Sequence, residues 1–518
     1  MQHSVFINSS CRMSNSPNLV IFIPDQWRGD VMGHLGNPAA VTPNIDRLVS
    51  EDAVSFSQAY CQNPVCTPSR CSFMTGWYPH TRGHRSMNHP LTRDEPCLLR
   101  ELKNAGYYIW WGGKNDLMSD EDAFSELCDE RHLPEETHKN LHIDQSWRKG
   151  TPQKPDFSFY AGELKKNEGE DVYLDSDWSH VLAAQNFIES YNDSRPFCVF
   201  LSIQYPHPPY GVEQPYYGSV QRNQIPSRIT AESTHGKPRM HQQLLDGLGL
   251  TDKPEKWWSE LRATYYEMCA RVDDQAGILL TALQQSGHYD ETAFFLFSDH
   301  GDFTGDYGLV EKAQNLMEDC LVRVPLIIKP PAKAKSQSGI CNALVELVDF
   351  PATVYDMVGI KPKYTHFGRT LLPLLKDPSG EHRDAVFTEG GRCDKESHCA
   401  ESDDLDDPTN LYAPRARIQT EDFTAHGKAV MCRTHRFKLI MRLYESDEFY
   451  DLEKDPNECI NRINDPDYDS ERKDLYQRIL RHLFETADIV PQTTQARDIP
   501  QSHFPLGNAI SRQLTACH

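Results

Sequence analysis

The residues of this sequence best suited to chemistry lie between positions 64 and 76, which read PVCTPSRCSFMTG. Pro68 is typical of the first turn of a helix, with the cap just before it, and Gly76 is typical of a helix end. Cys66 then precedes the cap, and Arg70 follows one turn further in. A nucleophile at a helix N-terminus lies in a positive field that suits an anionic substrate, and an arginine there can hydrogen-bond to a tetrahedral oxyanion.

Three apolar stretches typical of buried strands each end in polar side chains. Because the carboxyl ends of parallel strands meet at one edge of an open sheet, these side chains are expected to lie together, and their oxygens and imidazoles suit a metal ion. A lone Asp after a strand is otherwise a common helix cap, so it is the joint placement that favours a site. The stretches and the polar residues after them are 18–24 with Asp25 and Gln26, 197–203 with Gln204 and His207, and 292–298 with Asp299, His300 and Asp302.

The elements that must position these residues alternate between strand and helix. This alternation predicts an α/β fold with a doubly wound, mostly parallel sheet flanked by helices. Residues 115–178 are acidic and irregular and are expected to form an insertion in the alternating pattern. Residues 211–256 are expected to form a lid or surface loop. The expected strands are 18–24, 107–111, 197–203, 292–298 and 325–329, and the expected helices are 43–49, 95–105, 178–191 and 257–285.

The pattern changes after about residue 375, where short strand candidates follow one another closely. They predict a smaller C-terminal antiparallel sheet with one helix, at 471–484. The expected strands are 385–388, 428–432, 437–441 and 448–452. We therefore divide the chain into a polar N-terminal tail (1–17), a catalytic domain (18–375) and a C-terminal subdomain with a tail (376–518).

Composition excludes several classes of protein. The chain has 518 residues and a formal net charge of −22, which disfavours binding to nucleic acid or to anionic lipid. No stretch approaches the roughly 20 apolar residues of a membrane span, and the N-terminus lacks the apolar core of a signal peptide. The 15 cysteines are scattered without a zinc-type spacing, which predicts reduced thiols and a cytoplasmic protein.

The segment from Cys66 to Arg70 resembles the sulfatase signature C-x-P-x-R, and the flanking residues agree with it along its length. Asp25 precedes it and Asp299-His300-Gly301 follows it, in the order found in that family. The stretch 451–458, DLEKDPNE, also resembles a turn of the sulfatase C-terminal domain, so the resemblance covers about residues 18–465. It implies an alkaline-phosphatase-like fold and a hydrolase that acts on sulfate monoesters, of the arylsulfatase kind.

The resemblance also implies a modified nucleophile. In sulfatases a separate formylglycine-generating enzyme oxidises the signature cysteine, here Cys66, to formylglycine. The hydrated aldehyde carries two hydroxyls: one attacks sulfur, and the other later loses its proton and expels sulfate. A serine lacks the second hydroxyl and could not complete the cycle.

One divalent metal is implied at Asp25, Gln26, Asp299 and His300, together with the modified Cys66. Calcium is the usual ion of the family. Most arylsulfatases have Asp-Asp and Asp-Asn at the two pairs, whereas this chain has Asp-Gln and Asp-His, and an imidazole ligand makes Mn²⁺ or Zn²⁺ more plausible. The Asp-Gln and Asp-His pattern resembles the phosphonate monoester hydrolase and phosphodiesterase branch of the superfamily.

Three further residues match family positions that hold the transferred group or the leaving oxygen. Lys114 matches a Gly-Lys element, His207 matches a histidine that protonates the leaving oxygen, and Lys312 matches a lysine that contacts the sulfate. Asp116 stands where sulfatases usually have a histidine. His84, Asn88 and His89 are expected either to line the pocket mouth or to form an ordinary polar loop.

Three functions remain open from the sequence. The leading hypothesis is a small-molecule sulfate ester hydrolase. The alternative is a phosphonate monoester hydrolase or phosphodiesterase with the same apparatus, and the third is a silent member that binds a sulfated ligand. The sequence does not decide whether the chain forms a homo-oligomer.

Overall fold

A nine-stranded mixed sheet forms the centre of the computed structural model, which describes residues 16–120, 123–135, 146–151, 154–166, 171–401, 405–407 and 410–492. The strand order is β11-β2-β12-β10-β1-β8-β3-β4, and β13 also pairs with β2. The strands are β1 (Asn18–Asp25), β2 (Val54–Tyr60), β3 (Tyr108–Gly113), β4 (Glu130–His132), β8 (Phe197–Pro206), β10 (Thr292–Phe297), β11 (Arg323–Val324), β12 (Leu326–Lys329) and β13 (Gly339–Glu346).

The parallel part of this sheet confirms the predicted fold. β1 lies between β8 and β10 and is parallel to both, and β3 is parallel to β8. Every residue of β1 is buried, as expected for a continuous apolar run covered on both faces. The carboxyl ends of β1, β3, β8 and β10 therefore meet at one edge.

The other side of the sheet is less regular than simple alternation suggests. β12 pairs antiparallel with both β10 and β2, so the stretch predicted at 325–329 is a strand that reverses the chain direction. β2 and β13, which the sequence did not indicate, pair in parallel and complete this side. Polar residues interrupt β2, as in VSFSQAY, so it lacks the continuous apolar run of β1.

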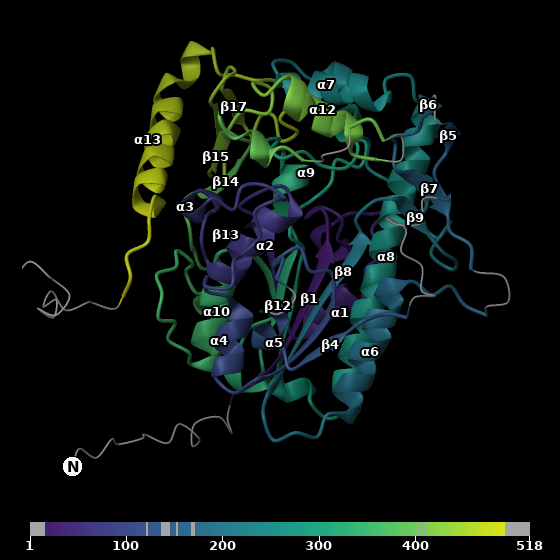
Figure 1. Ribbon diagram of the computed structural model, residues 1–518, viewed down its shortest axis with the longest axis vertical. Coiled ribbons are helices and arrows are strands. Elements are labelled where there is room, and N and C mark those ends of the chain that lie inside the picture. The colour runs from purple at the N-terminus through teal and green to yellow at the C-terminus, as the bar shows by residue number, and fades with distance from the viewer. Residues whose placement is uncertain are drawn as a thin grey trace, which may run out of the picture.

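Helices cover both faces of the sheet, as a doubly wound fold requires (Figure 1). α6 and α8 pack on each other and on β8, and α1 packs on α8. On the other side α2 packs against α4 and α10. Their bounds are α1 (Pro43–Glu51), α2 (Cys66–Thr75), α4 (Leu98–Asn104), α6 (Ser176–Ser190), α8 (Glu255–Gln285) and α10 (Asp349–Val358).

The two predicted insertions are more ordered than expected. Within 115–178, β4 joins the main sheet beside β3, and β7 (Tyr160–Glu163) pairs with β9 (Tyr210–Val212). The prediction of a lid or loop over 211–256 was wrong in part, because α7 (Arg239–Leu248) lies there and buries one apolar face. The remaining short elements are α3 (Pro79–Arg82), α5 (Phe124–Leu127), α9 (Asp319–Val322), α11 (Leu372–Lys376), β5 (Gly150–Thr151) and β6 (Lys154–Pro155).

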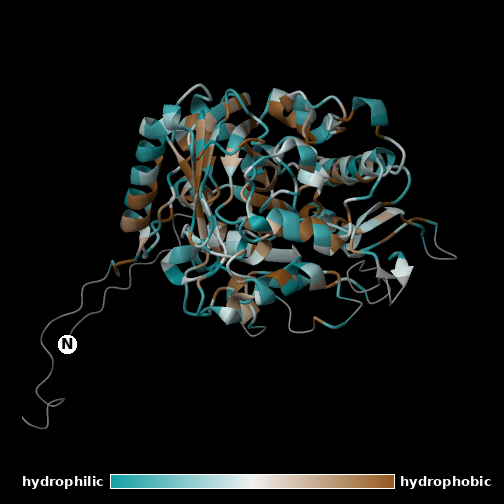
Figure 2. Cartoon of the chain, turned by 90° about the horizontal axis from the view of Figure 1, so that it is seen from above, coloured by the Kyte–Doolittle hydropathy of each residue, from teal (hydrophilic) through white to brown (hydrophobic). Residues whose placement is uncertain are grey.

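The C-terminal part confirms the predicted small antiparallel sheet and helix. Its strands are β14 (Val386–Gly390), β15 (Ala429–Arg433), β16 (Phe437–Arg442) and β17 (Glu448–Asp451), in that order. α13 (Asp469–Thr486) packs on this sheet through Leu475 and Ile479. In Figure 2 hydrophobic colour gathers on strands inside the molecule, and hydrophilic colour is common on the outer helices and loops. α12 (Ala413–Glu421), between β14 and β15, was not predicted. The domain boundaries at 17 and 375 stay predictions, and residues 1–15 of the tail lie outside the described part.

Two predictions about chemistry and environment can be compared with this fold. The 13 cysteines of the described residues are not paired with one another, and the expected reduced state stays a prediction. Among the described residues, no helix combines the length and the apolar character needed to cross a membrane.

Candidate active site

All nine predicted site residues lie together at the edge where the parallel strands end. Asp25 is the last residue of β1, Lys114 follows β3, and His207 follows β8. Asp299 and His300 follow β10 after one serine. The other four are Gln26, Cys66, Arg70 and Lys312.

Cys66 is the first residue of α2, and Val65 occupies the cap position. The sequence had predicted that Cys66 would precede the cap. Val65 is extended and supplies no side-chain cap, and the helix begins two residues earlier than the proline suggested. Cys66 Sγ lies 3.1 Å from His300 Nε2, 3.4 Å from Lys114 Nζ and 3.7 Å from Asp25 Oδ1. Burial raises the pKa of the Cys66 thiol, so the unmodified side chain is a neutral thiol and a poor nucleophile at neutral pH.

Arg70 lies one turn further along α2 and holds two carboxylates of the site. Its Nε donates to Asp299 Oδ2 at 2.9 Å, and its other nitrogens contact Asp25 Oδ2 at 3.3 Å and Ser202 Oγ at 2.6 Å. The side chain is almost fully buried. In this geometry Arg70 balances the negative charges of Asp25 and Asp299. The sequence had suggested instead that Arg70 contacts an oxyanion directly.

Asp25 is a buried carboxylate whose negative charge is balanced by several neighbouring positive charges. Burial opposes its charge, but the positive charges of Lys114, His207 and Arg70 lower the pKa of Asp25 well below its usual range. Lys114 Nζ forms a short ion pair with Asp25 and also lies 3.0 Å from Asp116. The backbone turn that delivers Lys114 depends on Gly113, which has a φ of 91° and packs against the carbonyl of Ser202 too closely for any side chain.

The donor set fits a divalent metal ion. One ligand atom from each of Asp25, Cys66, Asp299 and His300 lies within 4.8 Å of the others, and all four residues are buried. His300 Nδ1 lies 2.9 Å from the carbonyl oxygen of Gly301, an interaction that orients the ring and leaves Nε2 toward the cluster. Burial lowers the pKa of His300, which favours the neutral imidazole that binds metals.

Gln26 takes a different position from the one expected of a metal ligand. Its backbone N–H donates to Asp299 Oδ1 at 3.2 Å, whereas its side-chain oxygen accepts a hydrogen bond from Lys312 Nζ at 2.7 Å. Its side-chain nitrogen donates to Asp302. Burial raises the pKa of Asp302 to about 6, and Tyr210 also donates to this carboxylate at 2.8 Å. Through these hydrogen bonds Gln26 links Asp299, one of the metal-type ligands, to Lys312.

Lys312 and His207 face each other across the site, with Lys312 Nζ 2.8 Å from His207 Nε2. His207 Nδ1 lies 2.7 Å from the carbonyl oxygen of Pro208, which orients the ring. Burial disfavours the charge on Lys312, but the neighbouring carboxylate of Glu311 raises the pKa of the lysine, which is therefore a cation. Glu311 itself accepts a hydrogen bond from Lys312 Nζ at 2.5 Å.

Sequence reasoning missed Glu311 and Arg415, which hold Lys312 in place. Arg415, on α12, forms a short ion pair with Glu311, donates to the carbonyl of Lys312 at 2.7 Å and donates to Glu401 at 2.7 Å. Glu311 has a φ of 65°, and Gln26 and Asp116 also have positive φ, of 69° and 40°. Non-glycine residues in this strained region gather at functional sites, so backbone conformation marks Glu311 as a functional residue. Arg415 is found only through its contacts with Glu311 and Lys312.

The chemistry lies in a cavity of about 350 Å³. Cys66, Lys114, His207 and Lys312 all line it. The other lining residues are mostly polar and come partly from the C-terminal region. Asn88 is part of the lining, whereas His84 and His89 are not. The other lining residues are Val65, Met87, Asp116, Gln204, Glu401, Asn410, Tyr412 and Arg415.

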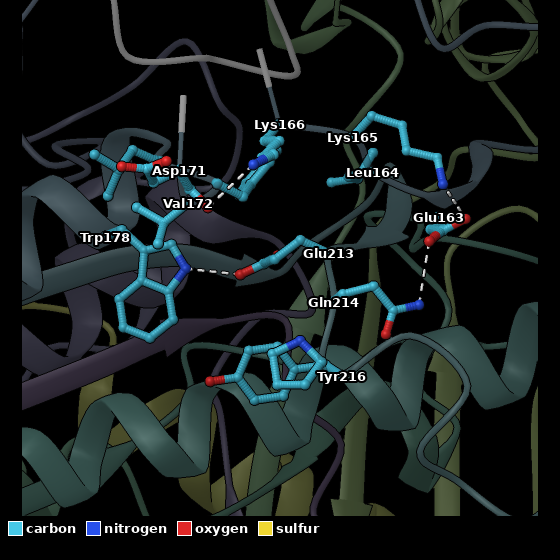
Figure 3. A pocket seen from close by; sticks show the side chains of 13 residues that line it. Glu163, Leu164, Lys165, Lys166, Asp171, Val172, Trp178, Glu213, Gln214 and Tyr216 are labelled. Carbon is cyan, nitrogen blue, oxygen red and sulfur yellow. Dashed lines mark hydrogen bonds and ion pairs between the residues drawn. The ribbon is translucent and has the colours of Figure 1, made fainter. Parts of the chain in front are cut away.

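A larger cavity, of about 570 Å³, lies elsewhere, near β7, β9 and α6 (Figure 3). None of the predicted site residues lines it. Its polar side chains pair with one another: Trp178 Nε1 donates to Glu213 at 2.7 Å, and Gln214 donates to Glu163 at 3.1 Å. Size alone does not make this cavity the reactive one, because its described lining residues include no cysteine, serine or histidine and no metal-type cluster.

Comparison with known proteins agrees with the geometry. The family model described as "Sulfatase" matches residues 17–360. An arylsulfatase of Clostridium perfringens (strain 13 / Type A) is 24% identical over 492 residues, which cover 90% of this chain and 93% of that protein. The multifunctional alkaline phosphatase superfamily protein PehA of Trinickia caryophylli is 25% identical over 543 residues, with 93% and 98% covered. The crystal structure of a phosphonate monoester hydrolase of Agrobacterium radiobacter superposes with a TM-score of 0.71 at 23% identity, covering 91% of this chain and 96% of that one.

Proposed function

The chain belongs to the sulfatase family, and on that basis we propose that it hydrolyses a small-molecule sulfate monoester with a nucleophile derived from Cys66. The observation that carries this proposal is the surroundings of Cys66 Sγ. It lies at a helix N-terminus, within 3.4 Å of Lys114 Nζ and 3.1 Å of a metal-type imidazole, and it lines a cavity that also contains His207 and Lys312. A helix N-terminus and two lysines favour a bound sulfate group.

The neutral thiol needs activation, and we propose that a formylglycine-generating enzyme converts Cys66 to formylglycine. The hydrated aldehyde supplies two hydroxyls on one carbon, one to attack sulfur and one whose deprotonation expels sulfate. Lys114 lies beside this carbon and stabilises negative charge on the sulfate oxygens. The histidine usual in the family at position 116 is replaced by Asp116, whose carboxylate pairs with Lys114.

Departure of the alcohol needs a proton at the ester oxygen. The pair formed by Lys312 Nζ and His207 Nε2 is suited to supply it, because the two nitrogens share a hydrogen bond at 2.8 Å and both residues line the cavity. The contact of His207 Nδ1 with the carbonyl of Pro208 keeps Nε2 toward Lys312. Glu311 and Arg415 fix the lysine in this position.

A divalent metal would be held by Asp25, Asp299 and His300 together with residue 66. When bound, it would polarise the nucleophile and the ester oxygens. Calcium is the usual ion of the family, and Mn²⁺ or Zn²⁺ suits the imidazole of His300. Gln26 would join the ligands only if its oxygen left Lys312.

Removal of the metal should abolish turnover. Treatment with a chelator is expected to lower kcat by about 100-fold or more, because a metal ion at such a site supplies several kcal/mol of charge stabilisation. Adding back Ca²⁺, Mn²⁺ and Zn²⁺ separately should restore activity with one of them most effectively. Full activity in chelated protein that is free of metal by elemental analysis would contradict this assignment.

Arg415 is expected to act as a positioning residue through Glu311 and Lys312. Replacement by glutamine should lower kcat about 10- to 100-fold, the usual cost of losing a residue that orients an active group. KM should change less, because the catalytic lysine remains present. Arg417→Gln on the same helix is the matched control, since its side chain is half exposed. A change in KM alone, with kcat preserved, would show that Arg415 contributes only to substrate binding.

A second candidate activity, on phosphonate monoesters or phosphodiesters, is favoured by the residue types of the Asp25-Gln26 and Asp299-His300 pairs. An aryl sulfate and the corresponding aryl phosphonate should be compared on one preparation. Faster hydrolysis of the sulfate supports the proposal, and faster hydrolysis of the phosphonate supports the alternative. Formylglycine-containing, metal-loaded protein that turns over neither ester would point to a silent member that binds a sulfated ligand.

A further inference from the structure

A second group of metal-type side chains lies outside the catalytic cluster. His89, His398 and Cys399 each offer a ligand atom, and these three atoms lie within 4.8 Å of one another. His89 is partly buried, His398 is exposed and Cys399 is buried. We propose that these residues bind a transition-metal ion of the zinc class, separately from the metal of the catalytic site.

The donor set selects the class of ion. Two imidazoles and one thiolate suit Zn²⁺ or Co²⁺, whereas Ca²⁺ and Mg²⁺ prefer oxygen ligands. His89 Nδ1 lies 2.6 Å from Ser86 Oγ, and when Nδ1 carries the proton, Nε2 has a free lone pair. Burial raises the pKa of the Cys399 thiol, so metal binding releases a proton from it. The exposed side of His398 leaves room for water as the fourth ligand.

The two segments that carry these ligands are already held together. Asn88 Nδ2 donates to the carbonyl oxygens of His398 at 3.2 Å and of Ala400 at 2.9 Å. The rings of His89 and His398 meet edge to face, with centroids 5.4 Å apart. The ligands therefore need only small side-chain shifts to close on an ion, without rearrangement of the backbone.

The position of the cluster connects it to the lining of the active-site cavity. Asn88 adjoins His89, and Glu401 follows Cys399 by two residues; both Asn88 and Glu401 line the cavity. A bound ion would hold these two lining segments together. We expect Zn²⁺ to raise the thermal unfolding midpoint, since any ligand that binds only the folded chain stabilises it.

Cobalt absorption tests the site directly. The full-length chain is prepared metal-free with Cys66→Ala, which removes the thiol of the catalytic cluster, and is titrated with Co²⁺. We expect a thiolate-to-cobalt charge-transfer band in the near ultraviolet, which saturates with added Co²⁺ and disappears when Zn²⁺ is added. Cobalt taken up by the oxygen and imidazole ligands of the catalytic site gives no such band, because Cys66 is absent. Absence of the band would overturn the proposal.

Two further variants assign the ligands. Adding Cys399→Ser should remove the band, whereas Cys393→Ser should preserve it, because Cys393 lies six residues away and outside the cluster. If Cys399→Ser does not fold, His398→Ala serves instead, because the side chain of His398 is exposed. The His398→Ala variant should bind cobalt about 100-fold more weakly, since losing a ligand costs at least as much affinity as losing a residue that orients a ligand. A band that survives Cys399→Ser, or an affinity unchanged by His398→Ala, would show that cobalt binds elsewhere.

Discussion

Replacing Cys66 with alanine is expected to reduce sulfate ester hydrolysis by about 10⁴-fold or more, because the variant has no nucleophile and covalent catalysis is lost. Cys66 lies among Lys114, His300 and Asp25, and no other described side chain of the cavity lining offers a nucleophile at that point. Steady-state rates on an aryl sulfate, measured on metal-loaded protein, provide the measurement. A variant that keeps more than a few per cent of the activity would contradict the assignment.

Cys66→Ser is the informative companion to this variant. A serine can attack sulfur once, but it has no second hydroxyl to expel the sulfate. The expected result is a single substoichiometric release of alcohol, and a chain whose mass increases by one sulfo group. Sustained turnover by the serine variant would exclude a mechanism that depends on two hydroxyls.

Replacing Arg70 with methionine is expected to lower the free energy of unfolding of the metal-free chain by about 3–5 kcal/mol, the usual cost of breaking a buried ion pair. Arg70 is almost fully buried and contacts the carboxylates of both Asp25 and Asp299, which would lose this compensation. Urea unfolding compared with the parent chain gives the difference. Turnover should fall as well, because the two carboxylates would no longer be held in position.

The matched control for this change is Arg93→Met. Arg93 pairs with Glu126, but its side chain is 55% exposed, so its loss should cost less than about 1 kcal/mol. Saturating divalent metal should recover part of the stability of Arg70→Met, since the ion would compensate the same two carboxylates. Equal stability losses in the two variants would mean that Arg70 does not carry the charge balance of the site.

The catalytic edge of the sheet could be predicted because its signals are local. Asp25 and Asp299 each stand at the end of a buried apolar stretch, and Pro68 and Gly76 indicate the helix that carries Cys66 and Arg70. The small C-terminal sheet was predictable for a similar reason, since four short strand candidates follow one another between 385 and 452.

Other parts of the fold and site depend on contacts between distant residues. Arg415 reaches Glu311 across more than 100 positions, and α12 buries polar side chains, so its sequence shows no apolar face. Polar residues interrupt β2, and its position in the sheet is set by pairing with β12 and β13. Likewise, Gln26 was expected among the metal ligands because it adjoins Asp25, whereas its positive φ directs it to Lys312 and Asp302.

The central claim is that this chain acts on sulfate esters through a formylglycine at position 66. The most direct measurement is mass spectrometry of the tryptic peptide 48–70, taken from alkylated protein that hydrolyses a sulfate ester. We predict an aldehyde at residue 66, in which one oxygen replaces the sulfur and two hydrogens of the cysteine. Cys61, in the same peptide, should be alkylated and serves as the internal control. A peptide from active protein in which Cys66 is alkylated throughout, like Cys61, would contradict the account.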